Sequence, residues 1–129
     1  MSKKLPLSVI IITKNEEKLI SACLESVSFA EDIVVLDAGS EDNTTEIAKS
    51  FGCRVFVEEW KGYGPQKQSA LEKTYHKWVL SLDADERIPP ETAQIISQII
   101  QDPKAQAYSS PSQKFLSWKM DKTQWVVAR

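Results

Sequence analysis

The sequence is poor in the residue types that mark several protein classes. It has only two cysteines, Cys23 and Cys53, and they lack the CxxC spacing of zinc and redox motifs. One falls in an expected helix and the other at an expected strand start, which favours burial as small hydrophobic side chains. We therefore expect a reducing, cytoplasmic environment.

An excess of charge of one sign is also lacking. Among 129 residues, 16 are basic and 18 are acidic, and neither sign forms a long run, so we expect no nucleic acid partner.

A long hydrophobic run is missing as well. The apolar run 7–12 gives way to polar residues at once, and it is too short for the core of a signal peptide or for a membrane span.

The chain does contain short apolar runs rich in β-branched residues, separated by helical patterns. The runs are continuous rather than alternating, which is typical of strands buried on both faces of a parallel sheet. They cover residues 7–12, 32–37, 54–57 and 77–83. The length and composition fit one globular domain.

Four helices are predicted between and after these runs. Their predicted positions are 19–27, 43–51 with Asn43 and Thr44 as capping candidates and Gly52 at the end, 64–75, and 89–102. The alternation predicts an α/β fold, a Rossmann-like open, mostly parallel sheet with helices on both faces. Ligands bind such sheets beyond the carboxyl ends of the strands.

The character of the sequence changes after Tyr108, where a run rich in serine begins. We assign residues 1–111 to a nucleotide-sugar-binding domain. Residues 112–129 show no clear period, so we treat them as a tail of undefined structure, a candidate remnant of an acceptor-binding half.

Polar residues follow the first and second predicted strands. Residues 13–17 start a helix at the sheet edge, where free backbone N–H groups could meet a polar ligand, although ordinary capping explains the segment equally well. Asp37 ends the second run, and Gly39 would let a ligand approach the loop closely. Asp42 and Asn43 fit the role of capping the next helix better.

Asp83 and Asp85 follow the fourth run. Two carboxylates two positions apart in extended chain point the same way, and their repulsion is costly unless a cation compensates it. Hard oxygen ligands select Mg²⁺ or Mn²⁺, which bind through one or two carboxylates plus substrate phosphates. We expect such a divalent metal to assist a departing nucleoside diphosphate.

Three ordered segments together resemble the family 2 glycosyltransferases, which have the GT-A fold. These segments are residues 8–17 (SVIIITKNEE), 34–44 (VVLDAGSEDNT) and 82–86 (LDADE). The sequences of residues 83–88 (DADERI) and 62–67 (GYGPQK) resemble those of the bacterial lipopolysaccharide core enzymes that add glucose to the inner core.

The resemblance implies a site drawn from all these segments. The residues implied to bind the nucleotide sugar are Thr13, Asn15, Glu16, Asp37, Gly39, Ser40, Gln66, Lys67, Asp83 and Ala84. Within this site Asp37 would contact the uracil, Asp83 the ribose or sugar and also the metal, and Asp85 the metal. Lys67 equally fits a solvated position on a helix face, and the lone His76 fits a surface position.

The general base is the part of the family pattern that the sequence lacks. Inverting members carry a further carboxylate that deprotonates the acceptor hydroxyl. Beyond Asp102 the only acid is Asp121, whose surroundings do not resemble that motif. Members of the family also continue well past this length, so we expect a chain truncated after the donor-binding half, with its catalytic residues unknown.

Three hypotheses follow. The first is a transferase that passes a hexose, which we expect to be glucose, from a UDP-sugar to a lipopolysaccharide core or related glycolipid with inversion. The second is a non-catalytic or truncated nucleotide-sugar-binding module without a base. The third, another α/β nucleotide-binding domain with structural aspartates, is disfavoured because neither a GxGxxG motif nor a P-loop follows the first strand.

The first hypothesis also implies partners and a location. A glycolipid acceptor implies peripheral contact with the inner face of a bacterial inner membrane, where lipopolysaccharide cores are built. An exposed fourth strand at the sheet edge would favour self-association, so a homodimer is a further expectation.

Overall fold

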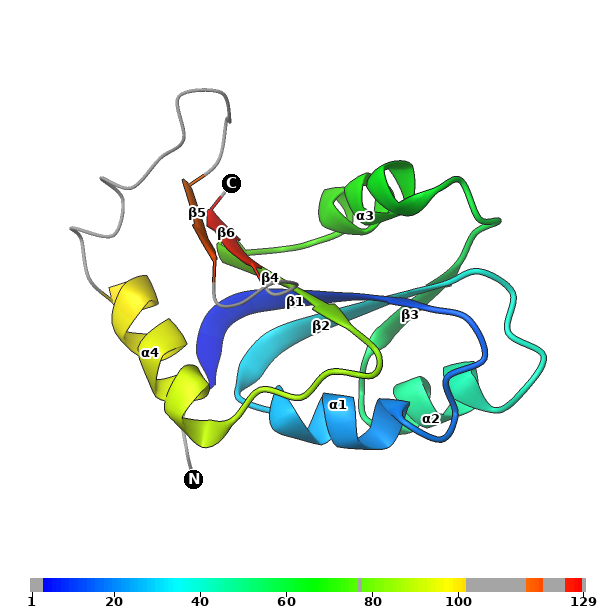
Figure 1. Cartoon of the computed structure of the whole chain (residues 1–129), viewed down its shortest axis with the longest axis horizontal. Helices are drawn as coiled ribbons and strands as arrows, with labels where there is room; N and C mark the ends of the chain where they lie inside the picture. Colours follow the sequence, from blue (N-terminus) through cyan, green and yellow to red (C-terminus); the bar gives the residue numbers. More distant parts are fainter. Residues whose placement is uncertain (1–3, 77, 102–115, 120–124, 129) are drawn as a thin grey trace.

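The computed structural model describes residues 4–76, 78–101, 116–119 and 125–128 (Figure 1). Strands and helices alternate along most of the chain. In order they are β1 (Leu5–Thr13), α1 (Ile20–Ser26), β2 (Ala30–Asp37), α2 (Thr44–Ser50), β3 (Arg54–Val57), α3 (Tyr63–Glu72), β4 (Trp78–Asp83), α4 (Pro90–Gln101), β5 (Leu116–Lys119) and β6 (Trp125–Ala128). The four predicted strands and four predicted helices are confirmed.

The strands form one sheet in the order β3-β2-β1-β4-β6-β5, and the first four are parallel. β1 lies between β2 and β4, so that Thr13 is paired with Asp37 and Ile12 with Asp83. The carboxyl ends of these three strands therefore meet at one edge of the sheet, where open α/β sheets bind their ligands.

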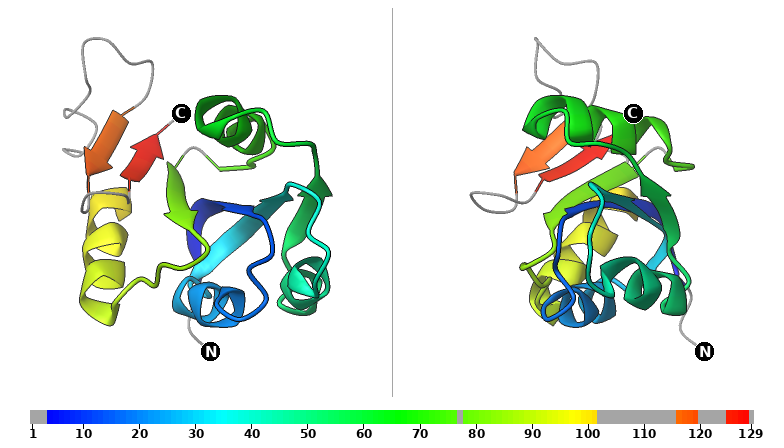
Figure 2. Two further views of the ribbon diagram at one scale, coloured as in Figure 1. Left: turned by 45° about the vertical axis from the view of Figure 1, so that its right-hand side comes forward. Right: turned by 90° about the vertical axis from the view of Figure 1, so that its right-hand side faces the viewer.

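Helices cover both faces of the sheet, as the Rossmann-like prediction requires. α1, α2 and α4 pack on one face, while α3 lies alone on the other (Figure 1). The rotated views in Figure 2 show the same separation of α3 from α1 and α2. The connections from β1 to β2 and from β2 to β3 each pass through one helix, in the manner of βαβ units.

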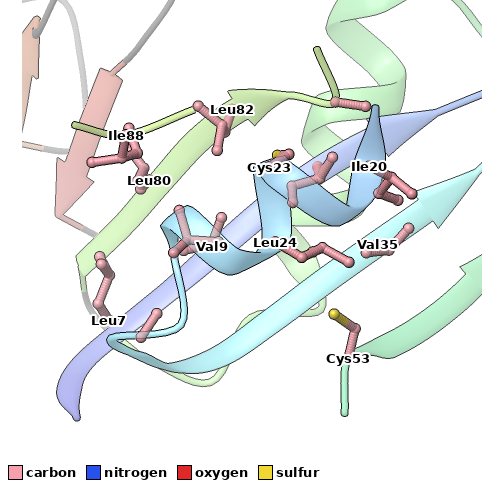
Figure 3. Packing of buried hydrophobic residues seen from close by; sticks show 14 of the residues in the cluster. Leu7, Val9, Ile20, Cys23, Leu24, Val35, Cys53, Leu80, Leu82 and Ile88 are labelled. Carbon is pink, nitrogen blue, oxygen red and sulfur yellow. The ribbon is translucent and has the colours of Figure 1, made fainter. Parts of the chain in front are cut away.

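The larger core lies between the sheet and the three-helix face. Ile20, Cys23 and Leu24 of α1 pack against Val9 of β1 and Val35 of β2 (Figure 3). All five side chains are at most 1% exposed. Burying an aliphatic side chain of this size contributes about 1.5–3 kcal/mol, so the packing of α1 on the sheet stabilises the central strands.

Both cysteines are buried and free, as predicted. Burial raises the pKa of the Cys23 thiol to about 12 and that of Cys53 to about 11. A thiol that stays protonated is a weak nucleophile, so the two cysteines act as packing residues.

The segment after residue 111 adds two strands that the sequence did not predict. β6 pairs antiparallel with β4, and β5 pairs antiparallel with β6. β4 is therefore an interior strand, and the expectation of self-association through an exposed β4 edge is wrong because β6 already covers it. No helix among the described residues is long and apolar enough to span a membrane.

A polar network ties β1, β2 and β3 together toward their amino ends. Ser8 and Asp32 are buried, and the Ser8 hydroxyl donates to the Asp32 carboxylate at 2.7 Å. Arg54 donates to both oxygens of Asp32 at 2.9 and 3.0 Å, and its guanidinium lies 3.7 Å from the ring centroid of Tyr75. The network thus fixes the starts of three strands whose other ends carry the site.

The charge state of Asp32 follows from these contacts. Burial alone would raise the pKa of Asp32, but hydrogen bonds from Arg54, Ser8 and the Tyr75 N–H, with the charge of Arg54, hold the pKa below its ordinary value of 3.8. Asp32 therefore contributes stability above the pKa of the unfolded state, and that contribution is lost as pH falls through the lower folded pKa.

Replacing Arg54 with methionine tests this network. Arg54→Met leaves a buried carboxylate without its counter-charge, so we expect the free energy of unfolding at pH 7 to fall by about 3 kcal/mol. The difference from wild type should shrink below about pH 4, where the carboxylate protonates. Urea unfolding at several pH values measures both effects, with Lys49→Met on the exposed surface of α2 as the control. A pH-independent difference contradicts the account.

Candidate functional site

A cleft of about 460 Å³ opens at the carboxyl ends of the parallel strands. Its volume lies within the range of roughly 300–1,000 Å³ that is usual for small-molecule sites. Five of the residues predicted from the sequence line it: Thr13, Glu16, Asp83, Ala84 and Asp85. The register of β1 with β4 brings these residues together, although they lie some seventy positions apart in the sequence.

The segment 14–17 after β1 is bound to the segment 38–44 after β2. The backbone N–H groups of residues 15–17 donate in turn to Ser40 Oγ at 2.7 Å, Thr44 Oγ1 at 2.8 Å and Asp42 Oδ2 at 3.2 Å. α1 begins only at Ile20. The expectation of free N–H groups in this segment is therefore wrong, because the neighbouring loop already uses them.

Asn15 is central to this contact between loops. Its backbone has a φ of 55°, in the left-handed region that asparagine tolerates better than most residues. Its side-chain oxygen accepts the Glu41 N–H at 2.8 Å, and the Lys14 ammonium donates to the Gly39 carbonyl at 2.9 Å. Asn15 does not line the cleft and instead holds the two loops in register.

Asp42, rather than Asn43, caps α2. An oxygen of the Asp42 carboxylate accepts the Thr44 N–H at 3.0 Å and also the Thr44 hydroxyl. Asn43 stands at the N-cap position but makes no side-chain capping bond. The capping prediction is confirmed for Asp42 and wrong for Asn43, whose backbone N–H binds Glu17.

Asp37 is 1% exposed and organises the loop that follows β2. Its carboxylate accepts the Thr13 hydroxyl at 2.7 Å, the Ser40 hydroxyl and N–H at 2.6 Å each, and the Gly39 N–H at 2.9 Å. These four donors match the roughly four acceptor sites of a carboxylate. Gly39, with a φ of 91°, lets the chain turn back over the carboxylate in a conformation that residues with a Cβ rarely adopt.

The acidic turn after β4 differs from the predicted extended chain. Asp83 is the last strand residue, and residues 84–85 form a turn. The turn is closed by the Glu86 N–H, which donates to the Asp83 carbonyl at 2.9 Å, and by the Asp83 N–H, which donates to the Glu86 carboxylate at 2.9 Å. Asp83 and Asp85 still line the same cleft, but a turn brings them there and not the alternation of a strand.

Carboxylates dominate this end of the cleft. Burial raises the pKa of Glu16, and the charges of Asp85, Asp42 and Asp83 raise it further. Burial also raises the pKa of Asp83; the nearby Lys67 ammonium opposes this rise, while Glu86 and Asp85 add to it. These groups are therefore held together against their repulsion, which a bound cation would relieve.

The carboxylates fit a metal that arrives with its substrate better than a preformed metal centre. Among the residues that the structure describes, no three His, Cys, Asp or Glu side chains form a cluster that could hold an ion. Mg²⁺ and Mn²⁺ need only one or two carboxylates when substrate phosphates supply further oxygens. Asp83 and Asp85, mutually repelling in one cleft, meet that requirement.

The remaining predicted residues lie around the cleft rather than in it. Gln66 is fully buried in α3, where its amide oxygen accepts the Lys61 N–H at 3.2 Å and its amide nitrogen donates to the Glu58 carbonyl at 3.4 Å. Lys67 lies close enough to Asp83 that its charge opposes the burial-driven rise in the pKa of Asp83. His76 is partly exposed, 3.7 Å from Glu31 and remote from the cleft, as predicted.

Five cleft residues were missing from the predicted set: Ile12, Lys14, Ala38, Trp60 and Tyr63. Trp60 and Tyr63 are the informative omissions. They follow β3 in a polar segment, where an aromatic side chain is not expected to join the core. Exposed aromatic residues in such a segment indicate a binding surface, so the sequence contained a signal for them. Asp121, the only acid in the predicted tail 112–129, lies outside the described residues.

Comparison with known sequences identifies close relatives. A lipopolysaccharide core biosynthesis glycosyltransferase of Rhizobium meliloti, LpsC, is 31% identical over 132 residues, which cover 98% of this chain and 46% of the relative. An uncharacterized glycosyltransferase of Rickettsia typhi is 40% identical over 94 residues, which cover 72% of this chain and 32% of the relative. The chain thus spans less than half the length of both relatives.

Solved structures share the fold. The first 349 residues of TarS from S. aureus superpose with a TM-score of 0.65 at 29% identity, and the match covers 74% of this chain and 32% of that fragment. Glucosyl-3-phosphoglycerate synthase of Mycobacterium tuberculosis, crystallised with Mn²⁺ and UDP, superposes with a TM-score of 0.63 at 23% identity. The match covers 78% of this chain and 41% of the synthase chain. The family model described as Glycosyl transferase family 2 matches residues 8–125. By this match and by its fold, the chain belongs to glycosyl transferase family 2.

Proposed function

We propose that this chain forms the donor site of an inverting transferase that passes a hexose, glucose in the first instance, from a UDP-sugar to a lipopolysaccharide core or related glycolipid. The observation that carries the proposal is the cleft in which Asp83 and Asp85 lie beside Thr13 and Glu16 at the carboxyl ends of β1 and β4. Two relatives support the proposal. LpsC is named for lipopolysaccharide core biosynthesis, and TarS, which is 28% identical to this chain, was crystallised with UDP-GlcNAc.

Each end of the cleft has a distinct role in the proposal. Asp85 and Asp83 would hold Mg²⁺ or Mn²⁺, and such an ion would supply positive charge to offset the negative charge of the departing UDP. Thr13 and Glu16 face the nucleotide, and Ala84 lets the sugar lie close to the turn. The charge of Lys67 on α3 acts on Asp83. In this proposal the Lys67 ammonium donates to an oxygen of the diphosphate, because a cation and a phosphate form strong charge-assisted hydrogen bonds.

The other implied residues do not line the cleft, and in this proposal they position the loops around it. Asp37, with Asn15 and Ser40, holds the loops after β1 and β2 at a fixed separation, and Gly39 keeps a side chain away from the ligand. For Asp37 to bind the uracil, the base must replace or share one of the four donors that the carboxylate now accepts. Gln66 acts through the segment that it holds and not through the diphosphate.

Donor binding can be separated from transfer. The three carboxylates that line the cleft, Glu16, Asp83 and Asp85, all have donor-side roles in this proposal, and none is assigned to deprotonate the acceptor. A nucleotide-sugar-binding module is therefore the second candidate function. The acceptor and the location, in the cytoplasm against the inner face of the bacterial inner membrane, rest on the likeness to LpsC.

Calorimetric titration of UDP in the presence and absence of Mn²⁺ tests the donor site. We expect wild type to bind UDP more tightly with Mn²⁺, and Asp85→Ala to weaken the Mn²⁺-dependent binding by at least ~10-fold, because it removes a carboxylate oxygen from the metal. Glu41→Ala, an exposed carboxylate on the adjacent loop that does not line the cleft, is the matched control. UDP binding that ignores both Mn²⁺ and Asp85 would sink the proposal.

The pKa of Asp83, raised mainly by burial, gives a second prediction, on stability. A carboxyl whose pKa is raised in the folded state stabilises the fold below its unfolded pKa, and this contribution is lost as pH rises through the folded pKa. Asp83→Asn should therefore raise the free energy of unfolding of the ligand-free chain at pH 7, on the order of 0.5 kcal/mol, while abolishing stabilisation by Mn²⁺ with UDP.

Urea unfolding between pH 7 and pH 4 measures this effect. The gain should diminish toward pH 4 as the wild-type carboxyl takes up its proton. An Asp83→Asn protein that is less stable than wild type at pH 7, or a gain of the same size at pH 4, contradicts the account of the acidic turn.

A further inference from the structure

Two exposed aromatic side chains lie in the cleft without a role in the site as described so far. Trp60 is 52% and Tyr63 is 71% exposed, and both line the cleft. Their ring centroids are 5.0 Å apart with an interplanar angle of 88°, an edge-to-face pair. In this arrangement the two rings brace each other and leave aromatic faces open to the cleft.

The segment that carries these rings is fixed before any ligand binds. Gln66, fully buried, binds the backbone of Lys61 and Glu58 on either side of Trp60. The Glu58 carboxylate in turn contacts the Lys61 ammonium at 2.6 Å, and it also contacts Lys73 and Ser69 of the helix region beyond. These partners lower the pKa of Glu58 to about 2, so the anchor stays charged throughout the working pH range.

Gly62 completes the support between the two rings. Its φ of 103° is a conformation that residues with a Cβ rarely adopt, and it turns the chain into the start of α3, where Tyr63 is the first residue. Because Gln66, Glu58 and the Gly62 turn already fix the backbone that carries the two rings, binding a ligand there need not order that backbone, which favours binding.

The two rings and the carboxylates come from opposite sides of the sheet's central strands. Asp83 and Asp85 follow β4, whereas Trp60 and Tyr63 follow β3, and β1 and β2 lie between these strands. One end of the cleft is therefore anionic and suited to a metal with a diphosphate. The other end presents aromatic faces, which suit a planar, uncharged ring rather than a phosphate.

We propose that Trp60 and Tyr63 form the wall against which the nucleobase of the nucleoside diphosphate stacks. This inference rests on the proposed donor site and adds the residues that recognise the base. A base stacked on an aromatic side chain gains enough that alanine substitution weakens binding by about 5- to 150-fold. Gln66 is a positioning residue for this wall, which explains why a fully buried glutamine occurs at the start of α3.

The test compares UDP with inorganic pyrophosphate, both with Mn²⁺, by calorimetric titration. Pyrophosphate carries the metal-binding diphosphate without a base. The variants are Trp60→Ala and Tyr63→Ala, the ring-retaining Trp60→Phe and Tyr63→Phe, and Phe51→Ala as a control for loss of an exposed aromatic residue outside the cleft. Fluorescence quenching by UDP in wild type and in Trp60→Phe reports directly on contact with Trp60.

We expect both alanine variants to lose at least ~5-fold in UDP affinity while binding pyrophosphate within about twofold of wild type. The phenylalanine variants should stay within a few-fold for UDP, and Trp60→Phe should lose most of the quenching. UDP binding that needs Asp85 but ignores both rings, or equal weakening for UDP and pyrophosphate, overturns this inference and leaves the donor site standing. A wild-type chain that binds neither ligand overturns both.

Discussion

The parallel pairing of β1 with β2 on one side and β4 on the other is the constraint on which the site depends. A parallel register leaves all three carboxyl ends at one edge of the sheet. Thr13 is therefore paired with Asp37, and Ile12 with Asp83, as a direct consequence of the strand pairing. Leu7, Val9, Ile10 and Ile11 of β1 are at most 4% exposed between helices on both faces. Because that burial fixes the register, it also fixes the spacing of the polar groups at the strand ends.

The polar groups at that edge divide into those that build the site and those left free to act in it. The side-chain oxygens of Asp37, Asn15 and Asp42 accept hydrogen bonds within and between the loops after β1 and β2, which holds these two loops together beside the cleft. Burial raises the pKa values of Asp83 and Glu16, and neighbouring carboxylates raise them further. Such strain is typical of a site whose partner is a cation, and the fold supplies the stability that offsets it elsewhere, through the core and the Asp32–Arg54 network.

Much of this could be predicted from the sequence because it depends on local patterns. Continuous apolar runs located the four parallel strands, and residues after them gave Thr13, Glu16, Asp83 and Asp85 of the cleft. The interlocking of the two loops could not be predicted, since it depends on which N–H group meets which side chain across twenty-five positions of sequence. β5 and β6 were missed although each is as long as β3, because no helical pattern was recognised on either side of them in the sequence. Trp60 enters the cleft only through the fold of the segment after β3.

The central claim is that this cleft holds a nucleotide sugar with its diphosphate over the β4 turn. A crystal structure of the chain grown with UDP and Mn²⁺ tests it most directly. The account predicts anomalous density for one Mn²⁺ between the diphosphate and the carboxylates of Asp85 and Asp83, with the nucleotide lying across the end of β1. UDP bound elsewhere on the chain, or a metal coordinated away from the turn at residues 83–86, would contradict it.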